Sequence, residues 1–411
     1  MKNILFVILL SPLLLAQESV VRWSGTYRLR TEADGRDFDL GSSPNLYTLS
    51  RLRLSADIHP AANVRIFGTI QDARRFGEEA TTSSNNKNLD LYEGYVVLDS
   101  LLLANLTVQA GRMQLACGSD RVLGISNWGN IGRAFDGFSL LYRWNGTKIG
   151  VIAADLSDPS LIPDPVNLPN TAYKRDNGAI LTGGYLTTPL WTELPATVYG
   201  LHEANHNRTI PGADDLQRTT IGARIAGAIG SEFVEADVAL QSGTKEGKKI
   251  AAWMAVLGIG ERFRDGFVSS ASLSIEFISG TKPGSSTVGT FTAPYANYHR
   301  LHGIMDYFIN FPVQTAEHGL IDMNVRTILT PVDASEVSIA LHRFTAQQPV
   351  LSGEPVKAFG DELDVIGAYR YSGNIAFELG LTAFVPEELM RTTFGGSDIG
   401  YWSYGSMVVS F

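Results

Sequence analysis

The segment Ser50-Arg51-Leu52-Arg53-Leu54-Ser55-Ala56-Asp57-Ile58 decides the fold class of this chain. Its apolar and polar side chains alternate, so a β-strand built from it has one apolar face and one strongly polar face. The same period of two recurs at 232–241, 321–329 and 374–385. Segments of about ten residues with this pattern are long enough to cross a bilayer as tilted strands, whereas strands of soluble sandwiches usually have about five or six residues. The pattern predicts an all-β, transmembrane, antiparallel up-and-down barrel.

The number and spacing of such segments favour a bacterial outer-membrane barrel, which needs an even number of strands. Connections after even-numbered segments are short and rich in turn residues, and those after odd-numbered segments are long and polar, with one short exception at 243–247. This parity places both chain ends on the periplasmic side. The eighteen predicted strands are 22–32, 47–58, 63–73, 88–98, 105–115, 134–144, 147–156, 178–187, 195–204, 217–227, 231–242, 249–261, 267–279, 319–329, 335–345, 359–371, 374–385 and 399–411.

The N-terminus has the order of residues that is typical of a secretory signal peptide. Lys2 precedes the apolar run 4–15, which is followed by Ala16. That run is too short to span a bilayer as a helix, which takes about 20 residues. A buried N-terminal strand or helix is the alternative. We expect residues 1–16 to be a signal peptide and residues 17–411 to form a single barrel domain with long extracellular loops, notably 280–318.

Composition excludes several classes of protein and site. The chain has 411 residues, a net charge of −9 and one cysteine, Cys117, so neither an internal disulfide nor a cysteine-based zinc site is available. The acidic balance, without a basic run, speaks against nucleic acid as a partner. His202-Glu203-Ala204-Asn205-His206 matches the zinc-protease motif, but that motif requires a helix, and here it follows a strand-like segment. On a strand the two histidines would lie about 13 Å apart, so we predict no metal site, no cofactor and no catalytic residues.

The phase of the strands predicts which charges face the barrel interior. Turning an arginine to lipid at mid-membrane costs about 2–4 kcal/mol, so the arginines of the first three strands should point inward and form a basic wall, with Trp23, Tyr27 and Leu29 on the lipid side. Acidic residues of later strands, Glu378 among them, should point inward elsewhere. The predicted pore-lining residues are Arg28, Arg30, Arg51, Arg53, Arg65, Arg112, Arg143, Glu235, Asp237, Glu276, Glu362 and Asp364.

Three stretches carry a family resemblance. Residues 106–115, continuing through Asn127-Trp128 and 132–137, resemble the signature segment of the alginate-export family of outer-membrane porins. Residues 295–308 resemble that family's long-loop motif, and 360–364 with 384–386 its closing strands. The resemblance implies an eighteen-stranded outer-membrane barrel with a polar, partly arginine-lined pore. The residues that match the signature include Gly111, Arg112, Arg121, Arg133, Asp136 and Gly137.

Arg112 is the one predicted pore residue that conflicts with its strand phase. Alternation with Leu106, Val108 and Ala110 would put it outward, unless a β-bulge changes the phase or the residue lies above the hydrocarbon. The family resemblance favours a lumenal or loop-anchoring role.

Together these patterns predict an outer-membrane channel for passive diffusion or export of polar, anionic or sugar-like solutes, acidic polysaccharides included. We expect the loop 280–318 to fold inward and narrow it. The strand that ends at Phe411 resembles the signal read by the barrel assembly machinery of outer membranes. The alternative is a non-conducting barrel that anchors a surface or electron-transfer partner. Such a scaffold should carry bulky apolar lumenal residues, whereas most predicted inward positions here are polar.

Overall fold

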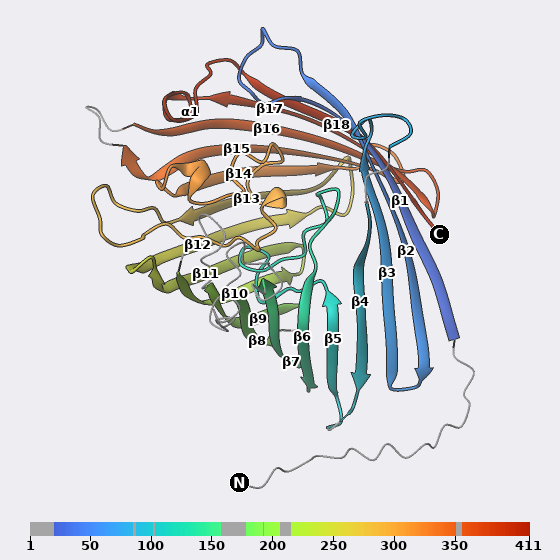
Figure 1. Ribbon diagram of the computed structural model, residues 1–411. Coiled ribbons are helices and arrows are strands. Elements are labelled where there is room, and N and C mark those ends of the chain that lie inside the picture. Colours follow the sequence, from blue (N-terminus) through green and yellow to red (C-terminus); the bar gives the residue numbers. More distant parts are fainter. Residues whose placement is uncertain are drawn as a thin grey trace, which may run out of the picture.

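Eighteen antiparallel strands form one closed sheet (Figure 1). The computed structural model describes residues 20–84, 88–101, 103–157, 178–191, 193–205, 215–350 and 356–411. Each strand pairs with its neighbours in sequence, and β1 pairs with β18 from Thr26 with Ser410 to Gly35 with Tyr401, which closes the barrel. The strands are β1 (Val20–Gly35), β2 (Asn45–Ala61), β3 (Val64–Arg75), β4 (Leu89–Asp99), β5 (Leu106–Met113), β6 (Phe135–Trp144), β7 (Thr147–Ser157), β8 (Ala179–Trp191), β9 (Leu194–Asn205), β10 (Leu216–Ile229), β11 (Glu232–Lys245), β12 (Lys248–Arg262), β13 (Val268–Ile278), β14 (Leu320–Leu329), β15 (Ser335–Val350), β16 (Val356–Arg370), β17 (Ile375–Pro386) and β18 (Gly400–Ser410).

The prediction of an eighteen-stranded barrel is confirmed, and each predicted segment overlaps one observed strand. The ends differ by a few residues, most at β8 and β15, which run on to Trp191 and Val350. Turns such as 145–146 and 230–231 follow even-numbered strands and define the short-turn end of the barrel. The long-loop end carries the other connections, with the expected short exception at 246–247. The expected signal peptide, 1–16, lies outside the described residues.

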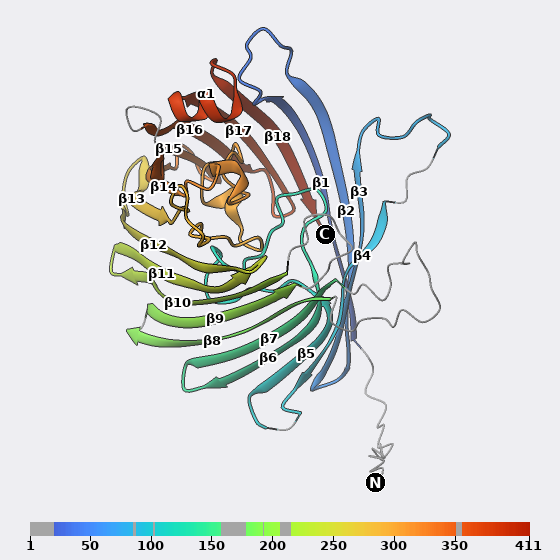
Figure 2. The ribbon, with the colours of Figure 1, turned by 60° about the vertical axis from the view of Figure 1, so that its left-hand side comes forward.

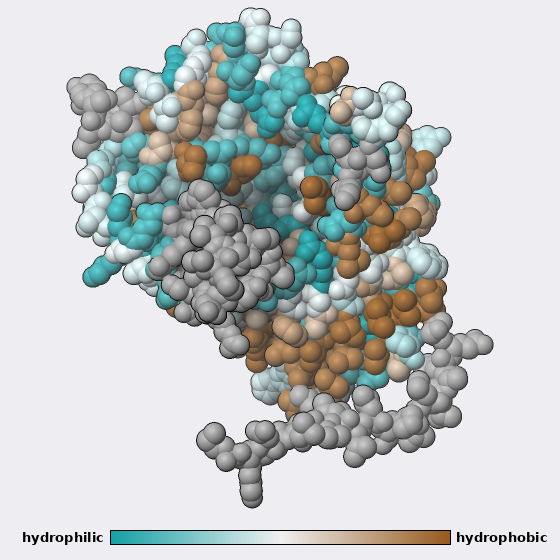
Figure 3. Space-filling model, in the orientation of Figure 1, coloured by the Kyte–Doolittle hydropathy of each residue, from teal (hydrophilic) through white to brown (hydrophobic). Residues whose placement is uncertain are grey.

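Apolar side chains on alternate strand positions form the outer face. Trp23 is 74% exposed and Leu240 is 68% exposed, as expected of side chains that meet lipid rather than water. Figure 3 shows hydrophobic residues gathered over the outside of the strands and hydrophilic residues around the hollowed interior. Among the described residues, no helix is long and apolar enough to cross a membrane.

Two connections fold into the barrel and provide its core. The first inner loop, residues 114–134, joins β5 to β6, and the second inner loop, residues 279–319, joins β13 to β14. In Figure 2 the second inner loop lies inside the ring of strands, with the first beside it. The second inner loop contains two short 3-10 helices, η2 (Tyr298–Arg300) and η3 (Val313–Thr315).

The interior beneath the second inner loop is partly apolar. Phe308 of this loop is fully buried, and its ring centroid lies 4.6 Å from that of Phe344 and 5.2 Å from that of Phe359. Phe384 completes the cluster, 6.3 Å from Phe308 between centroids. The expectation of a mostly polar interior is therefore wrong for this part of the wall, because the inner loop needs apolar partners to dock.

Candidate functional site

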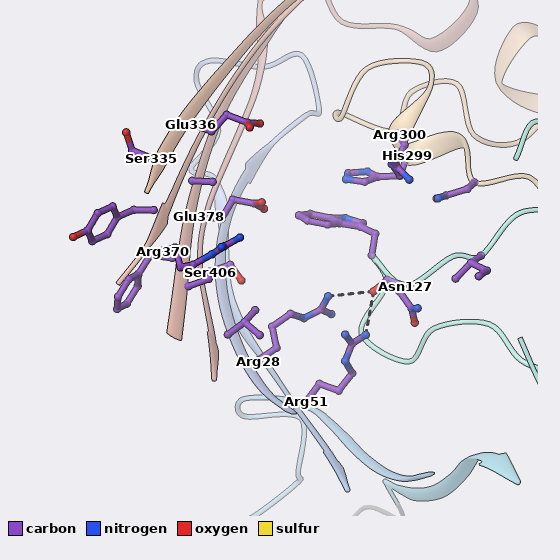
Figure 4. A pocket seen from close by; sticks show the side chains of 18 of the residues that line it. Arg28, Arg51, Asn127, His299, Arg300, Ser335, Glu336, Arg370, Glu378 and Ser406 are labelled. Carbon is purple, nitrogen blue, oxygen red and sulfur yellow. Dashed lines mark hydrogen bonds between the residues drawn. The ribbon is translucent and has the colours of Figure 1, made fainter. Parts of the chain in front are cut away.

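A cavity of about 960 Å³ separates the inner loops from the wall formed by β15–β18, β1 and β2 (Figure 4). Glu336, Glu378 and Ser406 extend from the wall, and His299 and Arg300 lie on the facing loop. Of the predicted pore residues, the cavity takes in Arg28 and Arg51. The charged and polar side chains that line it are Arg28, Arg51, Asp120, Asn127, Asn297, His299, Arg300, Ser335, Glu336, Arg370, Glu378 and Ser406.

Arg28 and Arg51 are directly opposite each other on β1 and β2. Their Nη1 atoms both donate to the carbonyl oxygen of Asn127, at 3.2 and 3.1 Å, and both guanidiniums also donate to the carbonyl of Gly129. Within the described part of the chain neither guanidinium contacts a carboxylate, and the buried Nε atoms of both have no hydrogen-bond partner. Backbone carbonyls carry no formal charge, so two positive charges remain uncompensated beside the cavity.

The other arginines of the predicted basic wall are engaged differently. Arg53 donates to Gln71 at 2.7 Å and lies over the ring of Tyr92, 3.6 Å from its centroid. Arg30 is neutralised by Glu32 at 2.7 Å, and Arg65 by Asp57 at 2.7 Å. The predicted basic wall therefore carries less positive charge than its five arginines suggest, because acids on the same inward faces pair with two of them. The sequence does indicate Glu32 as the partner of Arg30, because a spacing of two residues puts both side chains on one face of a strand.

Trp128 fixes the first inner loop against the wall and against the second inner loop. The Arg30 guanidinium carbon lies 4.0 Å from its ring centroid, and the His299 ring stacks on it at 4.1 Å. Two groups this close to one indole must occupy opposite faces. Both faces of Trp128 are thus covered, so it offers no platform on which a sugar ring could stack.

The two inner loops are joined by backbone hydrogen bonds and by Arg133. Gly124 N–H donates to the carbonyl of Tyr295 at 3.0 Å, and Asn297 N–H donates to that of Asp120 at 2.8 Å. The Arg133 guanidinium donates to the carbonyls of Tyr295 and Ala296, and burial lowers its pKa. The loops therefore form one partition across the barrel.

Arg121 attaches this partition to the wall. Its Nη1 lies 2.8 Å from Glu235 Oε1 on β11, and its Nε lies 2.8 Å from Glu276 Oε2 on β13. Burial alone would lower the pKa of Arg121, but the two carboxylates outweigh burial and raise it. Arg121 therefore stays charged and pairs with two acids that sequence phase had assigned to an open pore.

The second inner loop docks on further inward carboxylates. Met305 N–H donates to Glu362 at 2.9 Å, and Ile304 N–H donates to Asp364 at 3.3 Å. Gly303 has φ of +71°, and a Cβ there would lie 2.3 Å from the Glu362 carboxylate, so only glycine allows this approach. The neighbouring His302 is fully buried, which lowers its pKa to about 4.

These contacts correct the role expected of the inward acids. Asp237 and Glu362 are 0% exposed, Asp364 is 2% exposed and Glu276 is 5% exposed. They point inward as predicted, but the inner loops cover them, so they do not line an open passage. The alternation of residues along a strand predicts which way a side chain points, but it does not predict which loop covers that side chain.

The chain is similar in sequence to one known protein family. The family model described as "Alginate export" matches residues 21–395. The chain belongs to the alginate export family. No curated protein sequence matches it. Among solved structures it resembles the outer membrane protein OpdK of Pseudomonas aeruginosa, with a TM-score of 0.57 and 10% identity over 95% of this chain and 98% of that one. It also resembles OccD3 (OpdP) of the same organism, with a TM-score of 0.62 and 12% identity over 96% and 92% of the chains. OccAB1 of Acinetobacter baumannii is also similar, with a TM-score of 0.55 and 12% identity over 95% of this chain and 97% of that one.

This alginate export family member is an outer-membrane channel protein and not an enzyme, as its family and fold indicate. The residues of the family motif lie in the inner loops and on the strands β5 and β6. Arg121 and Arg133 anchor the inner loops, and Gly137 is needed on β6 because a Cβ there would lie 2.1 Å from the carbonyl of Ala153. Gly111, on β5, has φ of +127°.

Arg112 does not line the pore. It pairs with Asp136 at 2.8 Å across β5 and β6, on the strand face that carries Phe138, which is 61% exposed. The ladder on both sides of β5 is regular, so no bulge changes its phase. The residue sits outward at the long-loop end of the barrel, next to the first inner loop. Arg143 is exposed near the turn 145–146 and donates to Thr107 at 3.2 Å.

Two residues singled out by sequence have no part in the cavity. His202 lies on β9, a strand rather than the helix that the zinc motif requires, and His206 lies outside the described residues. Cys117 is 1% exposed in the first inner loop, and burial raises the pKa of its thiol to about 12.

Proposed function

We propose that this family member is a passive channel for small anionic solutes, sugar-like anions included, which pass through the cavity beside Arg28 and Arg51. The observation that carries the proposal is the pair of buried guanidiniums that contact only carbonyl groups on the cavity side of β1 and β2. Uncompensated charge that lines a narrow passage attracts ions of opposite sign and repels the others.

Acidic residues on the same wall sharpen this selectivity. Glu336 on β15 and Glu378 on β17 line the cavity together with Arg28 and Arg51 on β1 and β2, so a solute there meets negative charge at one part of the wall and positive charge at another. Such a transverse field orients polar molecules. A solute with a carboxylate at one end and hydroxyl groups at the other fits both sides. OpdK, which has a similar fold, has been crystallised with vanillate, an organic carboxylate, and this supports the proposed solute class.

The second candidate function is a non-conducting scaffold that anchors a surface or electron-transfer partner. The phenylalanine cluster under the second inner loop favours it, since it fills part of the barrel with apolar side chains. The charged cavity favours the channel, because a scaffold has no need of buried, unpaired arginines, which are costly. We therefore expect a channel of low conductance.

Reversal potentials in planar bilayers across a KCl gradient test the proposal. The double variant Arg28→Gln/Arg51→Gln should lower the chloride-to-potassium permeability ratio about two- to fivefold for each charge removed. This is the effect expected when a unit charge lies roughly 8 Å from an ion in water and salt screens part of the interaction. Glu336→Gln/Glu378→Gln should raise the ratio. Arg112→Gln is the matched control, since it removes an outward arginine. An unchanged ratio in the arginine double variant would refute the proposed passage.

We also propose that the assembly machinery of the outer membrane reads the strand that ends at Phe411, and that residues 1–16 are removed on export. The backbone of Phe411 pairs with that of Gly25 through two hydrogen bonds of 2.9 and 3.0 Å, so the last residue helps to close the barrel. Deletion of Phe411 should lower the amount of folded protein in outer membranes. Equal amounts of heat-modifiable protein from both forms would count against this role.

A further inference from the structure

The charges that line the cavity do not pair with one another, in contrast to charges elsewhere in the barrel. The charged lining residues are Arg28, Arg51, Arg300, Arg370, Asp120, Glu336 and Glu378. Among the described residues, no ion pair joins any of these four arginines to any of these three carboxylates. Other inward charges do meet, as Arg218 meets Glu203 and Arg65 meets Asp57. The cavity therefore presents unpaired charges of both signs to a solute.

The acidic part of the cavity is a row across three strands. Glu336 on β15 lies opposite Ala368 on β16, which lies opposite Glu378 on β17. Both glutamates extend from the wall in the same direction (Figure 4), and the small Ala368 leaves room between them. Neighbouring strands lie about 4.8 Å apart, so the Cα atoms of the two glutamates are roughly 10 Å apart. Glu378 accepts a hydrogen bond of 2.7 Å from the hydroxyl of Tyr404, which is neutral and leaves its charge uncompensated.

The basic part of the cavity is held apart from this row. Arg28 lies two strands and two residues away from Glu378 in the sheet, a separation of roughly 12 Å between Cα atoms. The carbonyls of Asn127 and Gly129 hold the guanidiniums of Arg28 and Arg51 against the first inner loop. Both arginines are only 9% exposed, and their Nε atoms have no partner in the described part of the chain. These buried, unpartnered groups point to an anionic ligand independently of the glutamates.

Two further arginines complete the charged lining. Arg370 is exposed at the end of β16 and lies diagonally beside Glu336 and Glu378, where such neighbours are about 7–8 Å apart. Arg300 extends from the second inner loop on the opposite side of the cavity (Figure 4). Arg370 thus lies close enough to weaken the attraction of the glutamates for a cation, but too far to neutralise them by direct contact.

We propose that the cavity binds amino carboxylates, with the carboxylate of the solute at Arg28 and Arg51 and its protonated amine between Glu336 and Glu378. The inference rests on the proposed passage and names the class of solute that it takes. An ammonium group brings a full positive charge and three hydrogen-bond donors, so it matches two carboxylates better than a hydroxyl group does. The separation of the two parts of the cavity favours solutes whose charges are several ångströms apart, such as 6-aminohexanoate, over glycine.

Block of the chloride current in planar bilayers tests this solute class. Hexanoate and 6-aminohexanoate are added in symmetrical KCl at pH 7.5, where the amine is protonated because alkyl ammonium groups titrate near pH 10. The wild type should bind 6-aminohexanoate about fivefold more tightly than hexanoate, the effect of a unit charge about 4 Å from a carboxylate in water. Glycine should block less than 6-aminohexanoate.

Variants assign the effect to the glutamates. Glu336→Gln/Glu378→Gln should abolish the difference between the two compounds without weakening the block by hexanoate. Arg370→Gln should enlarge the difference, because it removes the competing cation. Glu232→Gln/Glu261→Gln is the matched control, since these two exposed glutamates lie opposite each other on β11 and β12 and do not line the cavity.

The outcomes separate this inference from the proposed function. Equal affinities for the two compounds in the wild type, or the same difference in Glu336→Gln/Glu378→Gln, overturns the amine site and leaves the anion passage intact. Absence of chloride current overturns the passage and this inference together. Heat-modifiable gel mobility of each variant shows that the barrel has formed, so a lost difference cannot be ascribed to misfolding.

Discussion

Replacing Arg121 with glutamine should release the inner loops from the barrel wall. Removing one partner of a buried ion pair costs about 3–5 kcal/mol, because the remaining charge stays buried without compensation. Arg121 and Glu276 have side chains only 10% and 6% exposed, so this range applies to their pair, whereas Glu235, at 26%, adds less. At about 1.4 kcal/mol per factor of ten, the equilibrium constant for docking of the loops falls by about 100-fold to about 4,000-fold. The barrel itself should persist, since the strand ladder does not involve Arg121.

Two measurements report this undocking. Hydrogen exchange should accelerate in residues 119–133 and 295–305, where the loops are joined and attached to the wall, and remain slow in the strands. Single-channel recordings should show higher conductance and more open-channel noise, because the partition no longer narrows the lumen. The double variant Arg121→Gln/Glu276→Gln should recover part of the protection, as it removes one uncompensated carboxylate. Arg112→Gln is the control: its ion pair is exposed and is worth about 0–1 kcal/mol. Wild-type exchange and conductance in Arg121→Gln would show that the ion pairs of Arg121 do not hold the loops on the wall.

Two further predictions concern the inner loops. Gly303→Val should undock the second inner loop, because the residue has φ of +71° and a Cβ there meets the Glu362 carboxylate; hydrogen exchange of 298–308 measures this, and unchanged protection contradicts it. Cys117 should resist maleimide in the native barrel at pH 7.5, since it is 1% exposed and its thiol pKa is raised to about 12, so almost none is thiolate. Labelling should be complete after denaturation, and rapid labelling of the native barrel would show that the first inner loop opens.

Strand phase was the part of this structure that the sequence made predictable. Period-two alternation located all eighteen strands, and it gave the inward direction of Arg28, Arg51 and Asp237 correctly, because a strand has only two faces and lipid excludes charge from one of them. The same rule applied to Arg112 gives the observed outward direction. The prediction that Arg112 lines the pore is wrong because it follows the family resemblance and not the strand phase.

The groups that each inward side chain contacts could not be predicted from the sequence. Glu362 and Asp364 meet backbone N–H groups of residues about sixty positions away, and Arg28 meets carbonyls about one hundred positions away. Backbone groups carry no sequence signature, so no pattern of residue types identifies them as partners. The length of the loop 280–318 did suggest that it folds inward, but its docking on the acids of β13–β16 depends on tertiary contacts alone.

The two inner loops, joined to each other, leave a cavity with uncompensated positive charge, which we propose is the passage for anions. A planar-bilayer recording of the wild-type protein in a KCl gradient tests for this passage. The structure predicts a small, steady current whose reversal potential shows a preference for chloride over potassium. A barrel that carries no current, or a current that prefers potassium, would rule out an anion-selective passage beside Arg28 and Arg51.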